Sequence, residues 1–278
     1  MADLRLRARS ATEIVDAAFQ LYRRDALEYI LVTAVTYSPL LAAQLMLFGG
    51  KNGGDPRFTF DTLGTLWFVL FIIGGLGFAL MTAVVSRFSS DVYLGRSPDL
   101  GAIIREMVPK VLPLIGASFI LALVMMLGAI PLIVGVVTAN IGTGAIGSLL
   151  ACAWIVYALT RFFAVFQVIV LENRSVIAAF SRSSALSRGR KGHIFLTLFL
   201  VFLLFIVLAV AVATVGGIVG NQTTLAVLQM IYTIVAYPLI GIAQMLLYYD
   251  TRIRAEGFDI EVMTGALGQM TPPPEVAR

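Results

Sequence analysis

The chain has 278 residues, of which 59% are hydrophobic and only 13% are charged, and its formal net charge is +4. Soluble domains contain about 25% charged residues, so this composition excludes an ordinary soluble domain and indicates a membrane protein. The single cysteine, Cys152, and the single histidine, His193, exclude a disulfide framework and a metal site built from several such ligands. Because the sequence also contains no P-loop, dinucleotide-binding or HExxH motif, no cofactor is expected. The basic residues lie between apolar runs, where they set membrane topology, so nucleic acid is not an expected partner.

The N-terminal segment 10–24 predicts an amphipathic helix. Ser10 and Glu13 have the spacing of a capping box, which indicates that the helix begins there. One side of this helix is apolar, and its residues are Ile14, Val15, Ala18, Phe19, Leu21 and Tyr22. That side either lies in the membrane interface or packs on the protein's own cytoplasmic face. The sequence leaves both alternatives open.

Six apolar runs follow. A helix needs about 20 residues to cross a bilayer, and each run has at least this length. They cover residues 26–48, 63–86, 111–138, 144–171, 193–218 and 224–248. Two further short amphipathic segments, 96–110 and 174–190, precede the third and fifth runs. The sequence thus predicts an all-α integral membrane protein with six transmembrane helices and three cytoplasmic interfacial amphipathic helices. Residues 1–265 are expected to form a single polytopic membrane domain, and residues 266–278 a disordered, Pro-rich tail.

The same order of segments occurs three times along the chain. The pair Arg-Ser opens each short segment, at Arg9-Ser10, Arg96-Ser97 and Arg174-Ser175. Two apolar runs, joined by a loop on the far side of the membrane, follow each pair. The pattern predicts a three-fold internal repeat of one interfacial helix and one two-span hairpin.

The basic residues are distributed very unevenly between the two sides of the membrane. Of the 20 Lys and Arg residues, all except Lys51 and Arg57 lie on the side that holds both termini. Because cytoplasmic loops carry the excess of Lys and Arg, both termini are expected in the cytoplasm.

Three stretches of the chain resemble a known family. RARSATEIVDAAFQLYRR, VIVLENRSVIAAFSRSSALSRGR and LLYYDTRIRAEGFDIEVM resemble parts of the membrane domain of bacterial glycerophosphoryl diester phosphodiesterases. The resemblance implies a protein of the bacterial inner membrane, and in fused members it implies a TIM-barrel hydrolase beside the membrane domain. Only fifteen residues follow Met263, and the barrel's carboxylates, histidines and metal site have no counterparts in the chain. The resemblance therefore carries no activity over, and the chain is not expected to be an enzyme.

Arg161 is the most unusual polar residue, because it lies inside the fourth apolar run. If the helix is continuous, its guanidinium lies below the lipid headgroups, where an arginine needs polar partners. Tyr157, one turn earlier, and Gln167 are its candidate neighbours in an intramembrane polar site, and Glu28 or Asp250 are candidate partners from other helices. Arg161 is then either a structural tie between helices or a contact for a ligand or ion.

A basic, serine-rich segment precedes the fifth apolar run. Its cations are Arg182, Arg188, Arg190 and Lys191. They are candidate contacts for anionic phospholipid, since each basic residue at the membrane surface contributes about 1 kcal/mol. The alternative is that they mark topology alone.

Two further polar features lie near the ends of apolar runs. His193 is expected at the interface, and Asp250 with Arg254 has the i,i+4 spacing of an interfacial ion pair.

Two classes of function fit these observations. The first is a non-enzymatic membrane module that binds lipid or a membrane-protein partner through a basic cytoplasmic collar, formed by segments 10–24, 96–110 and 174–190. The second is a transporter or permease subunit with a polar path near Arg161. Scarcity of charge within the apolar runs favours the first class, whereas broken helices around a polar cavity would favour the second.

Reporter fusions test the predicted topology. Fusions in segments 94–98 and 186–190 and at residue 278 are expected to report the cytoplasm, and a fusion in loop 50–58 the opposite side, because the basic residues are so unevenly distributed. A cytoplasmic position of loop 50–58 would contradict the six-span topology.

Overall fold

The computed structural model describes residues 7–48, 60–138, 140–219 and 222–257. Every regular element in these residues is helical, which confirms the all-α class. The long helices are α2 (Ala26–Phe48), α3 (Phe60–Tyr93), α5 (Val111–Val137), α6 (Ile141–Arg161), α9 (Lys191–Val219), α10 (Gln222–Ala236) and α11 (Pro238–Glu256). The short helices are α1 (Ala11–Arg24), α4 (Leu100–Met107), α7 (Val165–Leu171) and α8 (Val176–Leu186), with a 3₁₀ turn at Val108–Lys110. The predicted loop 50–58 and the Pro-rich tail 266–278 lie outside the described residues.

Six helical segments of the described chain are long and apolar enough to cross a membrane, as the sequence predicts. They are Ala26–Ala43, Ile72–Tyr93, Leu100–Gly135, Ile141–Leu171, Lys191–Ile218 and Thr224–Glu256. The fourth segment is interrupted between α6 and α7, and the sixth between α10 and α11. The interruption between α10 and α11 is caused by Pro238, the first residue of α11. Proline lacks an N–H group, and its ring clashes with the preceding turn of a helix.

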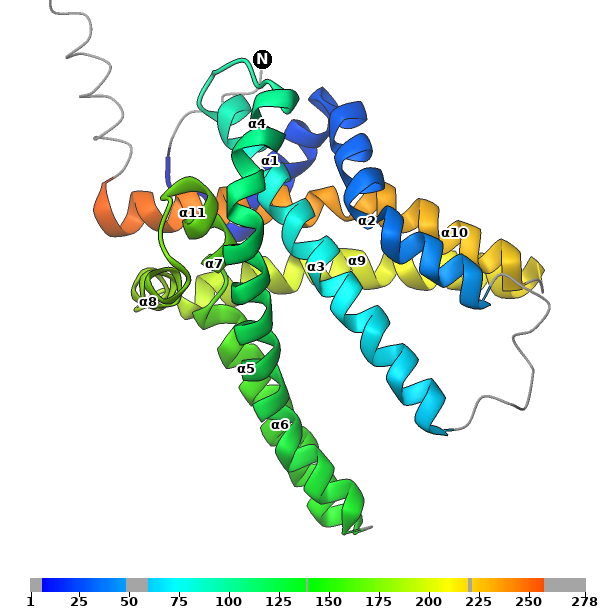
Figure 1. The fold of residues 1–278 in the computed structure, drawn as a ribbon. Helices are drawn as coiled ribbons and strands as arrows, with labels where there is room; N and C mark the ends of the chain where they lie inside the picture. Colours follow the sequence, from blue (N-terminus) through cyan, green and yellow to red (C-terminus); the bar gives the residue numbers. More distant parts are fainter. Residues whose placement is uncertain (1–6, 49–59, 139, 220–221, 258–278) are drawn as a thin grey trace, which may run out of the picture.

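Neighbouring long helices pack into three hairpins, α2–α3, α5–α6 and α9–α10. In Figure 1 the α5–α6 hairpin extends away from the short helices, while α2 and α10 extend in a different direction. The tip of the α5–α6 hairpin exposes large apolar side chains, among them Ile133, Val137, Ile141 and Ile146. An apolar surface of this kind suits a segment that acyl chains surround.

Helix α1 begins with the predicted capping box and packs on the protein itself. The Ser10 hydroxyl accepts from the N–H of Glu13 at 3.3 Å, and the Glu13 carboxylate accepts from the N–H of Ser10 at 2.7 Å. The second hydrogen bond is the largest of several effects that lower the pKa of Glu13 to about 2. Ile14, Ala18 and Leu21 are buried, and α1 packs mainly against α9 and α11. Of the two alternatives that the sequence leaves open, the structure favours packing on the protein's own face.

Helices α4 and α8 expose apolar side chains in addition to those they bury. On α4, Ile103 and Met107 are buried and Ile104 is exposed, and Val108 at the start of the following 3₁₀ turn is exposed as well. On α8, Ile177 is 80% exposed. These outward apolar side chains are in keeping with the predicted position of both helices at the membrane interface.

The second span of each hairpin leads into the region of the short helices, where α3, α7 and α11 contact one another (Figure 1). All three helices are followed by a left-handed residue: Gly95 at φ 74°, Asn173 at φ 53° and Gly257 at φ 67°. Glycine and asparagine adopt this conformation at low cost, and it ends a helix. The predicted order of short helix and hairpin is present, whereas a three-fold repeat of structure stays a prediction.

The α5–α6 hairpin depends on small residues where the two helices cross. A Cβ atom added at Gly147 would lie 2.3 Å from the carbonyl oxygen of Pro131, whereas one added at Gly144 would have no atom within 4 Å. We expect Gly147→Ala to lower the thermal unfolding temperature in detergent by about 3–10 °C, because overpacking forces the helices apart. Gly144→Ala is the matched control and should leave this temperature unchanged. Equal effects of the two changes would contradict the close crossing.

Candidate functional site

The fourth span breaks directly after Arg161, so the helix there is not continuous. Helix α6 ends at Arg161 and α7 begins at Val165, and backbone groups at such a break need partners from elsewhere in the protein. The hydroxyl of Ser183, a buried residue of α8, accepts from the N–H of Ala164 at 3.2 Å and donates to the carbonyl of Arg161 at 3.1 Å. Ser183 therefore stabilises the break and determines where Arg161 lies.

Arg161 and Lys191 meet at the ring of Tyr157. The guanidinium of Arg161 donates to the Tyr157 hydroxyl, and its Cζ lies 5.5 Å from the ring centroid. The Nζ of Lys191, the first residue of α9, lies 4.6 Å from the same centroid. Tyr157 is 37% exposed, so this group is accessible from outside the protein. We call these three residues the Tyr157 site.

The Tyr157 site has an excess of positive charge. Among the residues that the structure describes, no carboxylate lies within ion-pair distance of Arg161 or Lys191. Both cations contact the π face or edge of aromatic rings instead, and Arg161 also lies 5.7 Å from the ring centroid of Phe162. Arg161 is the last residue of α6, where the helix dipole favours a cation. The site can therefore accept an anion without first breaking an ion pair.

The remaining cations of the basic segment differ in their surroundings. Arg182 donates to Glu172 at 3.1 Å and to Glu256 at 2.8 Å. These hydrogen bonds, first that to Glu256, raise the pKa of Arg182. Arg190 donates to the backbone carbonyl of Arg254 at 2.7 Å. Arg182 and Arg190 thus join α8 and the start of α9 to α11.

Arg188 and Lys191, by contrast, are exposed. Of the four predicted lipid contacts, these two are the ones that the structure leaves most accessible. A ligand that binds Arg182 would have to compete with two carboxylates already bound to it.

Gln167 does not belong to the Tyr157 site, although the sequence predicts Arg161, Tyr157 and Gln167 as one group. Gln167 is fully buried, and its Nε2 donates to Ser86 at 3.4 Å and to Gln244 at 3.3 Å. Within the described chain, no hydrogen bond joins Gln167 to Arg161. The predicted intramembrane site therefore divides into an exposed cationic part and a buried amide part.

Asp250 is the centre of a third polar group. Its side chain is 0% exposed and accepts from the N–H of Arg9 at 2.7 Å, from Nε2 of His193 at 2.8 Å and from Nε of Arg254 at 2.9 Å. The i,i+4 spacing predicts the contact with Arg254, but no local signal relates Asp250 to the distant Arg9 and His193. Asp250 therefore joins the N-terminal segment and α9 to α11, and it is not the partner of Arg161.

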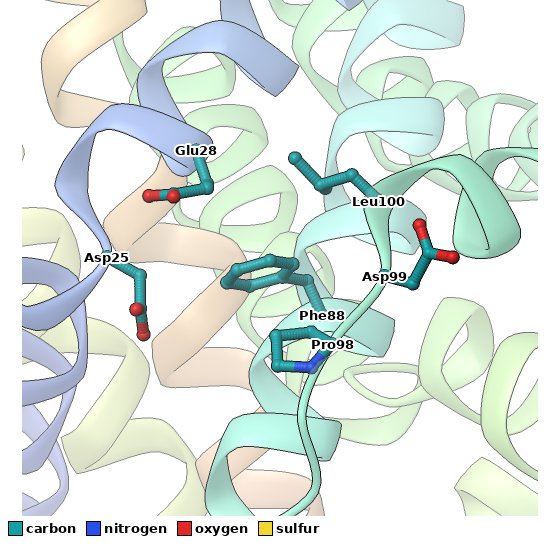
Figure 2. A pocket seen from close by; sticks show the side chains of 6 residues that line it. All are labelled: Asp25, Glu28, Phe88, Pro98, Asp99 and Leu100. Atoms are coloured by element: carbon teal, nitrogen blue, oxygen red, sulfur yellow. The ribbon is translucent and has the colours of Figure 1, made fainter.

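Three carboxylates line a cavity of ≈ 450 Å³ between the start of α2, α3 and the segment before α4. Figure 2 shows Asp25 and Glu28 on one side, Pro98, Asp99 and Leu100 on the other, and Phe88 between them. Burial is the main cause that raises the pKa of Asp25. The Asp99 carboxylate accepts from the N–H of Gly101 at 2.8 Å and so caps α4. The cavity is acidic, in contrast to the Tyr157 site.

No protein-family model, curated protein or solved structure matches this chain. The resemblance to the membrane domain of glycerophosphoryl diester phosphodiesterases therefore stays an expectation from the sequence. The polar groups described above are consequently interpreted from their own geometry and chemistry.

The contacts of Asp250 predict a large effect of its substitution. Asp250→Asn puts an NH₂ donor among N–H groups that now donate to the carboxylate, and it leaves Arg254 without its counter-ion. We expect the free energy of unfolding to fall by about 1.5–3 kcal/mol, the contribution of hydrogen bonds to a charged group, since Asp250 is fully buried whereas Arg254 is partly exposed. Asp16→Asn is the control, because Asp16 is exposed and, among the described residues, accepts a side-chain hydrogen bond only from Gln20 one turn later. Chemical unfolding in detergent measures both changes, and a fall no larger than that of the control would contradict the assigned role.

Proposed function

We propose that this chain is a non-enzymatic multi-pass protein of a bacterial inner membrane that binds an anionic phospholipid headgroup at the Tyr157 site. Both of its termini lie in the cytoplasm in this proposal. The observation that carries the proposal is the cation pair of Arg161 and Lys191, which share one exposed ring and have no carboxylate partner in the described residues. Positive charges of this kind at a membrane surface attract phosphate groups.

Other cations of the same region support the proposal by contrast. Arg182 is held by Glu172 and Glu256, and Arg254 is held by Asp250. Their charges are largely neutralised inside the protein. Within this region, the positive charge that remains available to an external ligand is therefore concentrated at the Tyr157 site and the exposed Arg188.

The surroundings of the site favour a lipid over a free phosphate ion. Lys191, Phe195 and Phe199 lie four residues apart on one face of α9, and both phenylalanines are exposed, with ring centroids 5.8 Å apart. Trp154 lies 6.0 Å from Tyr157 between ring centroids, and tryptophan and tyrosine are enriched at membrane interfaces. A ligand with a charged head and apolar chains matches this sequence of a cation followed by aromatic side chains.

The alternative function, a transporter or permease subunit, is supported by one observation, namely that two of the six spans are broken. The polar path predicted for it requires Arg161 and Gln167 to lie together. These residues belong to separate groups with different partners, which favours the lipid-binding proposal.

Native mass spectrometry of protein released from nanodiscs tests the proposal. Changing Arg161 and Lys191 together to Gln is expected to lower the affinity for phosphatidylglycerol roughly 30-fold, since each cation contributes about 1 kcal/mol. Binding of phosphatidylcholine should not change. The same spectra report any membrane protein that co-purifies, the second class of partner that the sequence predicts.

The matched control removes the same charge elsewhere. Arg23 and Arg105 are exposed cations of α1 and α4, and changing both to Gln should leave phosphatidylglycerol binding within about twofold of the unchanged protein. If this control loses as much lipid as the change at the Tyr157 site, the binding depends on net charge and the proposal is wrong.

A further inference from the structure

A cluster of uncharged polar side chains lies where α3, α7 and α11 meet. Gln167 of α7 donates to the hydroxyl of Ser86 on α3 at 3.4 Å and to the side-chain oxygen of Gln244 on α11 at 3.3 Å. Thr82 lies one turn before Ser86 on the same helix. Gly241 lets α3 and α11 approach closely here, because a Cβ atom at this position would lie 2.8 Å from Cγ1 of Val85 on α3, and Thr82 lies beside the same contact. The cluster therefore occupies a junction of three membrane spans.

Two fully buried atoms of this junction have no hydrogen-bond partner among the residues that the structure describes. They are Oε1 of Gln167 and Oγ1 of Thr82, and both residues are 0% exposed. Both bonds that Gln167 does make are long for an N–H donor and an oxygen acceptor, which have a usual distance of about 2.9–3.0 Å. The side chains of Gln167, Ser86 and Gln244 are thus close enough to interact but do not satisfy Gln167 fully.

Thr82 differs from the other buried threonines in spans. A threonine hydroxyl in a helix commonly donates to a carbonyl three or four residues earlier. The hydroxyls of the other buried threonines in spans do so, namely those of Thr33, Thr160, Thr197 and Thr251. The hydroxyl of Thr82 does not make this bond and remains available to another group. In hydrocarbon, a polar atom without a partner is strongly unfavourable, so atoms of this kind indicate that a further group binds there.

The acceptor and donor groups of the cluster favour a neutral ligand over an ion. An anion would face the lone pairs of Gln167 Oε1, and a cation would enter a cluster of amides and hydroxyls that contains no carboxylate to balance its charge. A neutral molecule avoids both problems if it donates one hydrogen bond to Gln167 and donates to or accepts from the hydroxyl groups. Water is such a molecule, and buried water characteristically bonds to polar groups that the protein leaves unsatisfied.

We infer that the junction of α3, α7 and α11 binds an internal water molecule, which donates to Gln167 Oε1 and completes the polar cluster of Gln167, Ser86, Gln244 and Thr82. The water joins three spans that otherwise contact one another through long hydrogen bonds and apolar packing. This site is independent of the Tyr157 site and lies in the interior of the bundle.

A structure of the protein in nanodiscs, at a resolution that shows ordered water, tests this inference directly. One peak is expected within about 2.7–3.2 Å of Gln167 Oε1. If the surrounding side chains are well defined and no peak lies within this distance, the inference is wrong.

Thermal unfolding gives an independent test. With water bound, Gln167 is satisfied, so Gln167→Met removes favourable bonds and should lower the unfolding temperature by roughly 3–6 °C. Without water, the same change removes two long hydrogen bonds but also removes an unsatisfied buried acceptor, so the two effects oppose each other. An unchanged or raised temperature would overturn the inference. Gln229→Met is the matched control, because Gln229 is an exposed residue of α10, and it should have no effect.

Exchange of salts distinguishes water from a monovalent cation. Replacing sodium or potassium chloride by choline chloride at constant ionic strength should leave the unfolding temperature unchanged. Stabilisation by sodium or potassium that Gln167→Met abolishes would show that the junction binds a cation, and would overturn the assignment of water.

Discussion

A buried carboxylate is tolerated only when donors surround it, and the end of this protein that holds the short helices is arranged around that requirement. Asp250 meets it with donors from three separate parts of the chain, namely Arg9 before α1, His193 in α9 and Arg254 in α11 itself. Arg254 in turn donates to the carbonyl of Arg9 at 2.7 Å. The N-terminal segment is thereby fixed beside α11, and α1 can bury its apolar side against α9 and α11.

A second network of hydrogen bonds to carboxylates joins α7, α8 and α11. Glu172, at the end of α7, accepts from Arg182 and from the hydroxyl of Tyr248, and Arg182 continues to Glu256. Charge is thus concentrated where the short helices lie. The hairpins extend away from this region (Figure 1), and the side chains that they expose are largely apolar. The protein's own carboxylates neutralise these arginines, whereas the cations beside Tyr157 have no carboxylate partner in the described residues. This difference is why we propose the Tyr157 site as the place for an external anion.

The two breaks in the spans have different origins. Between α10 and α11 the cause is local, because Pro238 cannot continue the helix without disturbance. Between α6 and α7 no proline occurs, and a serine from another helix, Ser183, bonds to backbone groups on both sides of the break. The second break places Arg161 at the end of a helix beside α9, and it lets α7 approach α3 and α11 with Gln167 on the inside.

Local pattern in the sequence determined the helical class, the six apolar spans, the capping box at Ser10 and Glu13, and the spacing that pairs Asp250 with Arg254. Each of these depends on residues a few positions apart, whose geometry a helix defines by itself. Tertiary structure decided whether α1 is covered by protein or by membrane, since an amphipathic helix has the same pattern in both cases. It also separated Gln167 from Arg161 and brought His193 to Asp250 and Lys191 to Tyr157. These contacts depend on how distant helices pack and where one of them breaks, and no period in the sequence encodes the partner of a side chain on another helix.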